Sequence, residues 1–242
     1  MTPASLAEVL ATFGPAYLAS HALPRGAAKV WRAILACRTA ALGGHVESCT
    51  DCGTSRHVYH SCRNRHCPRC QTRAKEAWLA ARRREVLPVP YFHLVFTLPH
   101  ALNGLIGTAP RRLYENLFAA ASATLIKFAG SPRHLGGMPA FSLVLHTWKQ
   151  DLGRHVHVHA LVAGGALSDD GEWIRPKKGF LFPVRALSKV FRGKFIAGLD
   201  DLRRQGHLPD FLDHSAWQGL KLGLYAHDWV VYAKQPLGGP QA

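Results

Sequence analysis

Three histidines alternate with apolar residues in one short stretch, at His155, His157 and His159. Successive side chains of an extended strand point to opposite faces, so these imidazoles are expected to share one face. The valines and alanines between and after them indicate that the other face meets a core. Neutral imidazoles are common ligands for divalent metals, and three of them at this spacing favour a metal site over ordinary surface histidines.

A second group of candidate ligands consists of two Cys-x-x-Cys motifs, Cys49/Cys52 and Cys67/Cys70, which are separated by 14 residues. This spacing is typical of a structural zinc site, where each motif supplies two thiolates to a tetrahedral ion. Gly53 directly after the first motif favours a tight turn there. The alternatives, free structural thiols or a redox pair, explain paired motifs less well. The sequence therefore predicts structural zinc.

Other donors leave the zinc ligand set partly open. Cys62 and His66 lie close to the second motif, and either could replace one of the four cysteines. Cys37 lies apart from the other cysteines in a helical pattern, and we interpret it as a small core residue. A module this short has little apolar core, so the metal is expected to hold it folded.

The chain is strongly basic. Its 242 residues hold 30 lysines and arginines against 15 acidic residues, which gives a formal net charge of +15. Such a field attracts polyanions, of which nucleic acid is the most common partner, although membrane surfaces also attract basic proteins. With 48% apolar residues the chain can bury a core and is predicted to be globular rather than disordered.

Basic residues are concentrated beside the second cysteine motif. Between residues 62 and 85 the only acidic residues are Glu76 and Glu85. A solvated helix face is the plain alternative, but this imbalance next to a zinc module favours contacts with DNA phosphates. The predicted DNA-binding residues are Arg63, Arg65, Arg69, Arg73, Lys75, Arg82, Arg83 and Arg84.

The N-terminus lacks the basic start and apolar core of a signal peptide. No stretch approaches the roughly 18 uninterrupted apolar residues of a membrane span. The cysteine spacing suits metal binding rather than disulfides, so we expect the protein in the reducing cytoplasm. The missing apolar span leads us to expect no membrane contact.

Apolar periodicity predicts both helices and strands. Pro15 is expected near a break in the first helix, the pair Gly43-Gly44 is expected to end the second, and residues 168–171 form a strong turn signal. Residues 236–242 have no core-forming content and are predicted to be disordered. The predicted helices are residues 5–22, 26–42, 71–85, 110–129 and 187–202, and the predicted strands are 91–98, 141–147, 156–162 and 227–232.

Several blocks together resemble the rolling-circle transposases of bacterial insertion sequences. They occur in order along almost the whole chain and are highly specific. The blocks are residues 61–71 (SCRNRHCPRCQ), 91–99 (YFHLVFTLP), 133–136 (RHLG), 146–148 (HTW), 155–165 (HVHVHALVAGG) and 191–195 (FRGKF).

The resemblance implies a zinc-binding N-terminal domain followed by an HUH nuclease domain, named for its histidine–hydrophobic–histidine motif. Such nucleases hold a divalent metal, usually Mg²⁺ or Mn²⁺, on an antiparallel sheet. The metal polarises a phosphate of single-stranded DNA, and a tyrosine attacks it to form a 5′-phosphotyrosine link. The motif matches His157 and His159. A third ligand is usual, and His155, Gln150 and Asp151 are candidates ahead of His146.

Two departures from the family pattern matter. Val156 stands where relatives often have proline. In the family the catalytic tyrosines lie on a helix after the strand matched by residues 229–234, and this chain stops at Ala242. The resemblance therefore predicts a C-terminally truncated transposase. Neither Tyr225 nor Tyr232 matches the family's nucleophile, and Tyr232 is predicted to be a packing residue in its strand.

We therefore predict an α+β protein: a helical, zinc-binding DNA-binding domain at residues 1–88, then an HUH-type antiparallel sheet with flanking helices at 89–242. The function expected first is a transposase that binds transposon ends and nicks and transfers single strands with a divalent metal. The second is a catalytically inactive DNA-binding fragment of such a transposase. A zinc hydrolase is a third reading, for which the sequence offers no convincing carboxylate base. The oligomeric state is left open.

Overall fold

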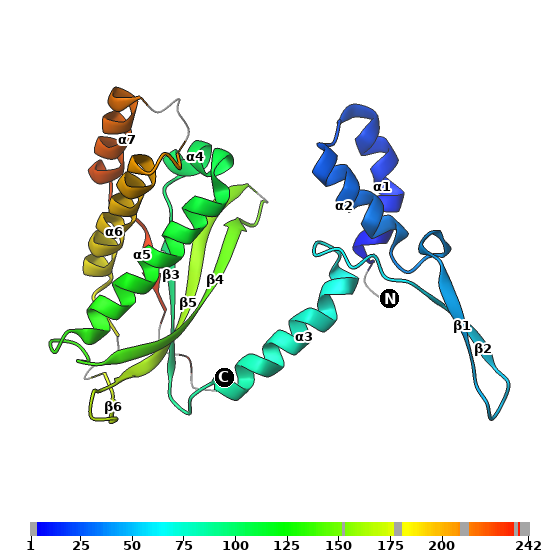
Figure 1. The fold of residues 1–242 in the computed structure, drawn as a ribbon, viewed down its shortest axis with the longest axis horizontal. Coiled ribbons are helices and arrows are strands. Elements are labelled where there is room, and N and C mark those ends of the chain that lie inside the picture. The colour runs from blue at the N-terminus through cyan, green and yellow to red at the C-terminus, as the bar shows by residue number, and fades with distance from the viewer. Residues whose placement is uncertain (1–3, 152, 177–180, 209–212, 235–236, 238–242) are drawn as a thin grey trace. The chain divides into compact units, whose positions relative to one another are not determined.

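The computed structural model describes residues 4–151, 153–176, 181–208, 213–234 and 237 (Figure 1). The chain divides into two compact units, Met1–Val86 and Leu87–Ala242. The boundary expected from the sequence, between residues 88 and 89, lies two residues from this division. Each unit has its own core and its own group of candidate metal ligands.

Two helices begin unit 1. Helix α1 (Leu6–Ser20) starts with a capping box, in which the Ser5 hydroxyl accepts from the Glu8 amide and the Glu8 carboxylate accepts from the Ser5 amide. The predicted break at Pro15 is wrong, because α1 continues through it. A Cβ on Gly14 would lie only 2.6 Å from the Trp31 ring of α2, so glycine permits the close contact between these helices.

Helix α2 (Arg25–Ala36) ends six residues earlier than predicted, and a 3₁₀ turn, η1 (Ala40–Leu42), follows. The chain then forms an antiparallel hairpin of β1 (Gly44–Ser48) and β2 (Ser55–Tyr59), almost all of it exposed. The last element of unit 1 is the basic helix α3 (Pro68–Glu85), which begins with proline at its first turn.

Unit 1 buries few apolar side chains. Its core cluster contains only Ile34, Cys37 and Cys67 as fully buried members among the described residues. Several apolar side chains of α1 are instead exposed, including Phe13. Two of the three buried core residues are cysteines, which fits the expectation that a metal stabilises this unit.

Unit 2 is built on an antiparallel sheet whose strands follow the order β4-β5-β3-β7, with a short β6 paired to β5. The predicted α+β class with an antiparallel sheet is confirmed. The long pair β4–β5 carries register shifts between Pro139 and Phe141 and between His146 and Trp148. The strands are β3 (Tyr91–Thr97), β4 (Met138–Trp148), β5 (Arg154–Leu167), β6 (Trp173–Ile174) and β7 (Val231–Ala233).

Burial alternates along the two central strands. In β3 the side chains of Phe92, Leu94 and Phe96 are buried, and the residues between them are partly exposed. In β5 the same holds for Val156 and Val158. Helices α5 (Pro110–Gly130) and α6 (Val184–Arg204) cover the buried face (Figure 1). The three histidines of β5 therefore lie on the opposite face.

Three helical elements of unit 2 were not expected: η2 (His100–Leu102), α4 (Asn103–Thr108) and α7 (His214–Ala226). The last strand begins at Val231, four residues later than predicted. The disorder predicted for residues 236–242 lies outside the described residues, except that Leu237 forms a β-bridge with Tyr91. No helix in the described part of the chain combines the length and apolar character that a membrane crossing requires.

Candidate metal centres

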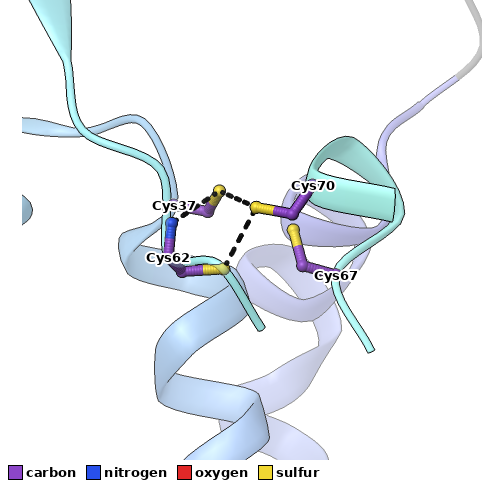
Figure 2. A group of neighbouring side chains, drawn as sticks. All are labelled: Cys37, Cys62, Cys67 and Cys70. Carbon is purple, nitrogen blue, oxygen red and sulfur yellow. Dashed lines mark hydrogen bonds between the residues drawn. The ribbon is translucent and has the colours of Figure 1, made fainter. Parts of the chain in front are cut away.

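Four cysteines of unit 1 bring their sulfur atoms together, namely Cys37, Cys62, Cys67 and Cys70 (Figure 2). All four Sγ atoms lie within 4.8 Å of one another. The Sγ of Cys70 is 3.5 Å from that of Cys37 and 3.6 Å from that of Cys62. Thiolates about 2.3 Å from a tetrahedral zinc ion are roughly 3.8 Å apart, so these distances fit a closed four-cysteine site.

Backbone geometry at helix ends positions the four sulfur atoms. Cys37 caps the C-terminus of α2, Cys67 caps the N-terminus of α3, and Cys70 lies in the first turn of α3. Arg38 and Arg63, each directly after a cysteine of the cluster, are the described non-glycine residues with positive φ, at 58° and 50°. Such a conformation costs on the order of 1 kcal/mol, and here it turns the backbone around the sulfur cluster.

The thiols influence one another's protonation. Burial raises the pKa of Cys62 to about 12 and also raises the pKa of Cys37. Burial opposes the shift at Cys70, but hydrogen bonds from the other three thiols outweigh it and lower the pKa of Cys70 to about 7. The cluster thus favours one thiolate on Cys70 when no metal is bound. A divalent cation would favour ionisation of the remaining thiols.

The ligand set expected from the sequence, Cys49, Cys52, Cys67 and Cys70, is not the set that the structure brings together. Cys49 and Cys52 are exposed and lie in the β1–β2 turn, outside the cluster. Gly53 adopts φ +71° there, and its amide donates to the Cys49 carbonyl, so the expected tight turn is present. The hairpin carries this motif away, because antiparallel pairing places residues 49–54 at its far end.

Cys37 has a further contact that the sequence did not predict. It is buried as predicted, but its sulfur belongs to the cluster and accepts from the Cys62 amide at 3.5 Å. Cys62, considered a replacement ligand, is a member, whereas His66 is exposed and lies outside the group. The spacing Cys-x₄-Cys-x₂-Cys over residues 62–70 was the signal that could have identified three of the four members.

The predicted DNA-binding side chains lie on α3 and on the loop before it. At about 100° per residue, Arg69, Arg73, Arg83 and Arg84 share one side of α3, and Lys75 and Arg82 lie on the other. Most of the eight predicted residues are exposed. Arg82 differs, because it pairs with Glu85 at 2.7 Å and its guanidinium lies 5.9 Å from the centre of the Trp78 ring. Arg82 is therefore engaged within the helix.

In unit 2, His146, His157 and His159 form a second group of candidate ligands. His146 lies directly across from His157 in the β4–β5 pair. The Nε2 atoms of His157 and His159 are 3.1 Å apart. Two nitrogens at right angles, each about 2.1 Å from one ion, would be roughly 3 Å apart, so the donor set fits a bound cation.

Hydrogen bonds fix which ring nitrogen each histidine presents. The Nδ1–H of His157 donates to the His155 carbonyl at 3.0 Å, which leaves the lone pair of His157 on Nε2, facing Nε2 of His159. The Nδ1 of His159 lies 2.7 Å from Nε2 of His93 on β3, and the two rings are stacked. The sequence analysis did not identify His93 as part of the site. A single histidine in an apolar strand does not show which side chain of the neighbouring strand lies beside it.

The structure changes the order of the candidates for the third ligand. His146, considered the weakest, belongs to the group, whereas His155 instead pairs with Nε2 of His100 at 3.0 Å. Asp151 pairs with Lys149 at 2.8 Å and does not lie in the group, whereas Gln150 lines the pocket beside it. Cross-strand pairing with β4 brings His146 close, and this pairing could not be deduced from positions along the sequence.

The electrostatics of the site favour neutral imidazoles. Burial first, and then the neighbouring histidines, lower the pKa of His159 to about 4. Burial also lowers the pKa values of His93 and His146. Since only a neutral imidazole has a free lone pair for a cation, these shifts keep His146 and His159 in the form that can bind metal at neutral pH.

An open pocket of about 440 Å³ adjoins the histidine group. Trp148, at the end of β4, is 52% exposed, and its ring stacks on that of His146. The pocket thus combines imidazole, aromatic, amide and ammonium groups. Its lining residues are Val95, His146, Trp148, Lys149, Gln150, His155 and His157.

The tyrosines near the C-terminus occupy different surroundings. Tyr232 on β7 pairs with Val95, whose partner on the other side is His159, so Tyr232 shares the histidine-bearing face of the sheet. It is 53% exposed, and the prediction that it is a packing residue is wrong. Tyr225 lies on α7, beneath the Arg192 guanidinium.

Comparisons with known proteins match two sequence families along the chain. The sequence family described as "Transposase zinc-binding domain" matches residues 9–98, and the family described as "Putative transposase" matches residues 140–242. "Putative transposase y4qJ" of Sinorhizobium fredii is 44% identical over 98% of this chain. The transposase for insertion sequence element IS801 of Pseudomonas savastanoi pv. phaseolicola is 30% identical over 82% of it. The chain spans 61% and 48% of the lengths of these relatives.

Among solved structures, the conjugative relaxase TrwC in complex with mutant OriT DNA is similar over 53% of this chain and 53% of that chain. The sequence identity is 16% and the TM-score is 0.36. A metal-bound TrwC complex is similar at the same TM-score of 0.36, with 13% identity over 56% of this chain and 64% of that chain. Likeness at this level carries no argument about the function of the present chain.

Proposed function

We propose that this chain, which belongs to the IS91 family of insertion-sequence transposases, binds DNA and acts on a single-stranded DNA phosphate through a divalent metal held by His146, His157 and His159. The observation that carries the proposal is the convergence of three imidazoles on one sheet face, with hydrogen bonds that direct two Nε2 atoms toward a common point.

The chain's own groups prepare the site for this chemistry. The His155 carbonyl and the His93 ring hold the two β5 imidazoles by their Nδ1 atoms, so that no reorganisation is needed to present Nε2. When bound, the divalent metal would act as a Lewis acid on a phosphate oxygen. Three imidazoles suit a transition metal better than Mg²⁺, which prefers oxygen ligands, so we expect Mn²⁺ to bind more tightly than Mg²⁺.

The nucleophile is proposed to be a tyrosine, as in the family. Neither Tyr225 nor Tyr232 hydrogen-bonds to the histidine group in the described part of the chain, and neither is assigned this role. Attack by a tyrosine hydroxyl on the phosphorus would form a phosphotyrosine bond, break the P–O3′ bond and leave a free 3′-OH.

Unit 1 is proposed to bind DNA through α3. The cysteine cluster would hold a structural zinc ion that fixes the start of this helix, since Cys67 and Cys70 lie in its first turn. The exposed arginines Arg69, Arg73, Arg83 and Arg84 would then contact phosphates along one side of α3. The affinity should fall steeply as the salt concentration rises, because phosphate contacts release counterions.

The test combines transposon-end single strands with the protein and Mn²⁺, followed by denaturing electrophoresis. A nick that depends on Mn²⁺ is the expected product, and His157→Ala should abolish it; a covalent protein–DNA adduct would place the nucleophilic tyrosine within this chain. An adduct that persists in the variant Tyr225→Phe/Tyr232→Phe would support a nucleophile other than these two residues. Unchanged cleavage by His157→Ala would contradict the proposed role of the histidine group.

A catalytically inactive DNA-binding protein is the second candidate, and the exposed arginine face of α3 favours it independently of the histidines. It predicts salt-sensitive DNA binding without adduct or nick at any Mn²⁺ concentration. A zinc hydrolase is disfavoured, because the described histidine group contains no carboxylate that could serve as a base.

A further inference from the structure

Trp148 is an exposed aromatic residue beside the histidine group. It ends β4, two residues after His146, and its side chain lines the same pocket as the histidines. The indole and imidazole rings are stacked, with centroids 5.5 Å apart and planes inclined by 13°. The aromatic surface therefore continues directly from a metal-ligand candidate into the open pocket.

The exposure of this indole is not explained by packing in unit 2. Trp229, by contrast, is buried among Phe191 and Phe195 and donates its indole N–H to the Leu224 carbonyl. Trp148 keeps 52% of its surface exposed at the rim of a pocket. An exposed tryptophan beside a phosphate-binding site is well suited to stack on a base, because every base offers a flat face.

The neighbours of Trp148 suit a nucleotide better than an apolar ligand. Lys149 and Gln150 line the same pocket, and Arg154 is the cross-strand partner of Trp148. Lys149 pairs with Asp151 in a half-exposed salt bridge, which holds its ammonium group near the rim, whereas Arg154 donates to the Asn103 carbonyl and does not line the pocket. The Lys149 ammonium would attract the DNA backbone, and the Gln150 amide can hydrogen-bond with a base edge.

From this arrangement we infer that Trp148 forms a stacking subsite for one unpaired base of the DNA strand whose phosphate lies at the histidine centre. The inference rests on the proposed function and adds a cause for a single-strand preference. A base paired within a duplex is stacked between its neighbours and cannot offer its face to the indole.

The test is a thermodynamic cycle on the full-length chain in the presence of Mn²⁺. Fluorescently labelled oligo(dT) is compared with an abasic strand of equal length and equal phosphate charge, using the original protein and Trp148→Ala. Base contacts made elsewhere on the protein are common to both proteins and cancel in the cycle. The original protein should bind oligo(dT) about 10-fold more tightly than the abasic strand, and Trp148→Ala should lose most of this preference.

Two further variants keep the result interpretable. Trp148→Phe, which retains a smaller aromatic ring, should preserve part of the base preference. Tyr232→Ala removes an aromatic side chain of similar exposure from the histidine-bearing face, two strands from β5, and should leave the preference intact. Mn²⁺ affinity measured without DNA should stay within about 3-fold in all three variants, since none removes a ligand.

The outcomes separate this inference from the proposed function. The stacking subsite is overturned if Trp148→Ala weakens the binding of oligo(dT) and of the abasic strand equally. It is also overturned if Tyr232→Ala loses the preference for oligo(dT) to the same extent as Trp148→Ala. So would an original protein that does not distinguish the two strands. The proposed function fails instead if His157→Ala leaves both Mn²⁺ affinity and Mn²⁺-dependent DNA binding unchanged.

Discussion

The two candidate metal centres differ in what surrounds them. The cysteine cluster supplies two of the three fully buried residues in the core of unit 1, whereas the histidine group lies on the outer face of a sheet whose other face packs against a large apolar core. A metal in the first site would replace a missing core. A metal in the second would be added to a structure that is already stable. We therefore expect a metal at the cysteine cluster to serve folding and a metal at the histidine group to serve chemistry.

The largest expected effect is loss of the zinc ion from unit 1. Cys70→Ser, or a strong chelator, should unfold this unit, since zinc binding in small modules contributes on the order of 10 kcal/mol to folding. Hydrogen exchange followed by mass spectrometry should show unit 1 exchanging rapidly while β3 and β5 stay protected.

The matched control is the double variant Cys49→Ser/Cys52→Ser, which should retain one zinc per chain by elemental analysis. Loss of zinc from that variant would show that Cys49 and Cys52 are zinc ligands, as the sequence predicted. If unit 1 stays folded without zinc, the cysteine cluster is not needed for folding, and the two centres do not differ in this respect.

The next effect in size concerns the histidine centre. His159→Ala should weaken Mn²⁺ binding by at least about 100-fold in titration calorimetry, because it removes a direct ligand. The melting temperature without metal should change by only a few degrees, since His159 lies outside the core of unit 2. A variant that unfolds would mean that this site, like the cysteine cluster, supports the fold.

A smaller effect is expected from His93, which acts through His159 as a positioning residue. His93→Ala should reduce Mn²⁺ affinity by about 10-fold to 100-fold, because the Nδ1 of His159 loses the group that orients it. His93→Gln, which can still accept a hydrogen bond, should recover part of the affinity. Equal affinities in the original protein and His93→Ala would show that the backbone alone positions His159.

The smallest effect is a pH dependence of unit 2 without metal. Burial lowers the pKa of His159 from 6.5 to about 4, so between these values the unfolded chain binds a proton that the folded chain does not. The stability associated with neutral His159 is therefore fully present above pH 6.5 and declines as the pH falls toward 4. Thermal melts across this range should show the decline, and His159→Gln should reduce it, leaving the smaller part that is due to His93 and His146. An equal slope in that variant would assign the decline to other groups.

The sequence was informative where chemistry depends on neighbours along the chain. Alternation alone placed His155, His157 and His159 on one strand face, and Gly53 correctly indicated a turn. It was less informative where chemistry depends on pairing between distant elements. Cys37 lies 25 residues before Cys62, and nothing in the helical pattern around it reveals that α2 ends there against the α3 N-terminus.

The same reason explains the histidines that were ranked too low or missed. His146 and His93 reach the site from β4 and β3, and their distance from His159 depends on strand register. The register shift between His146 and Trp148 changes which side chains face the pocket, and no local signal indicated it. The helix α7 was missed although Asp213 caps its N-terminus by accepting from the Ala216 amide.

The strand order has a consequence for synthesis on the ribosome. Strand β3 lies between β5 and β7, so its two partners are made long after it, at residues 154–167 and 231–233. Unit 1, by contrast, consists of residues 1–86, so all of its residues have been made before β3. Domains generally fold as units in the order of synthesis. Unit 1 can therefore bind its metal before the strands that pair with β3 have been synthesised. Zinc supply would then act early in translation, and the histidine centre could assemble only once β5 has been made.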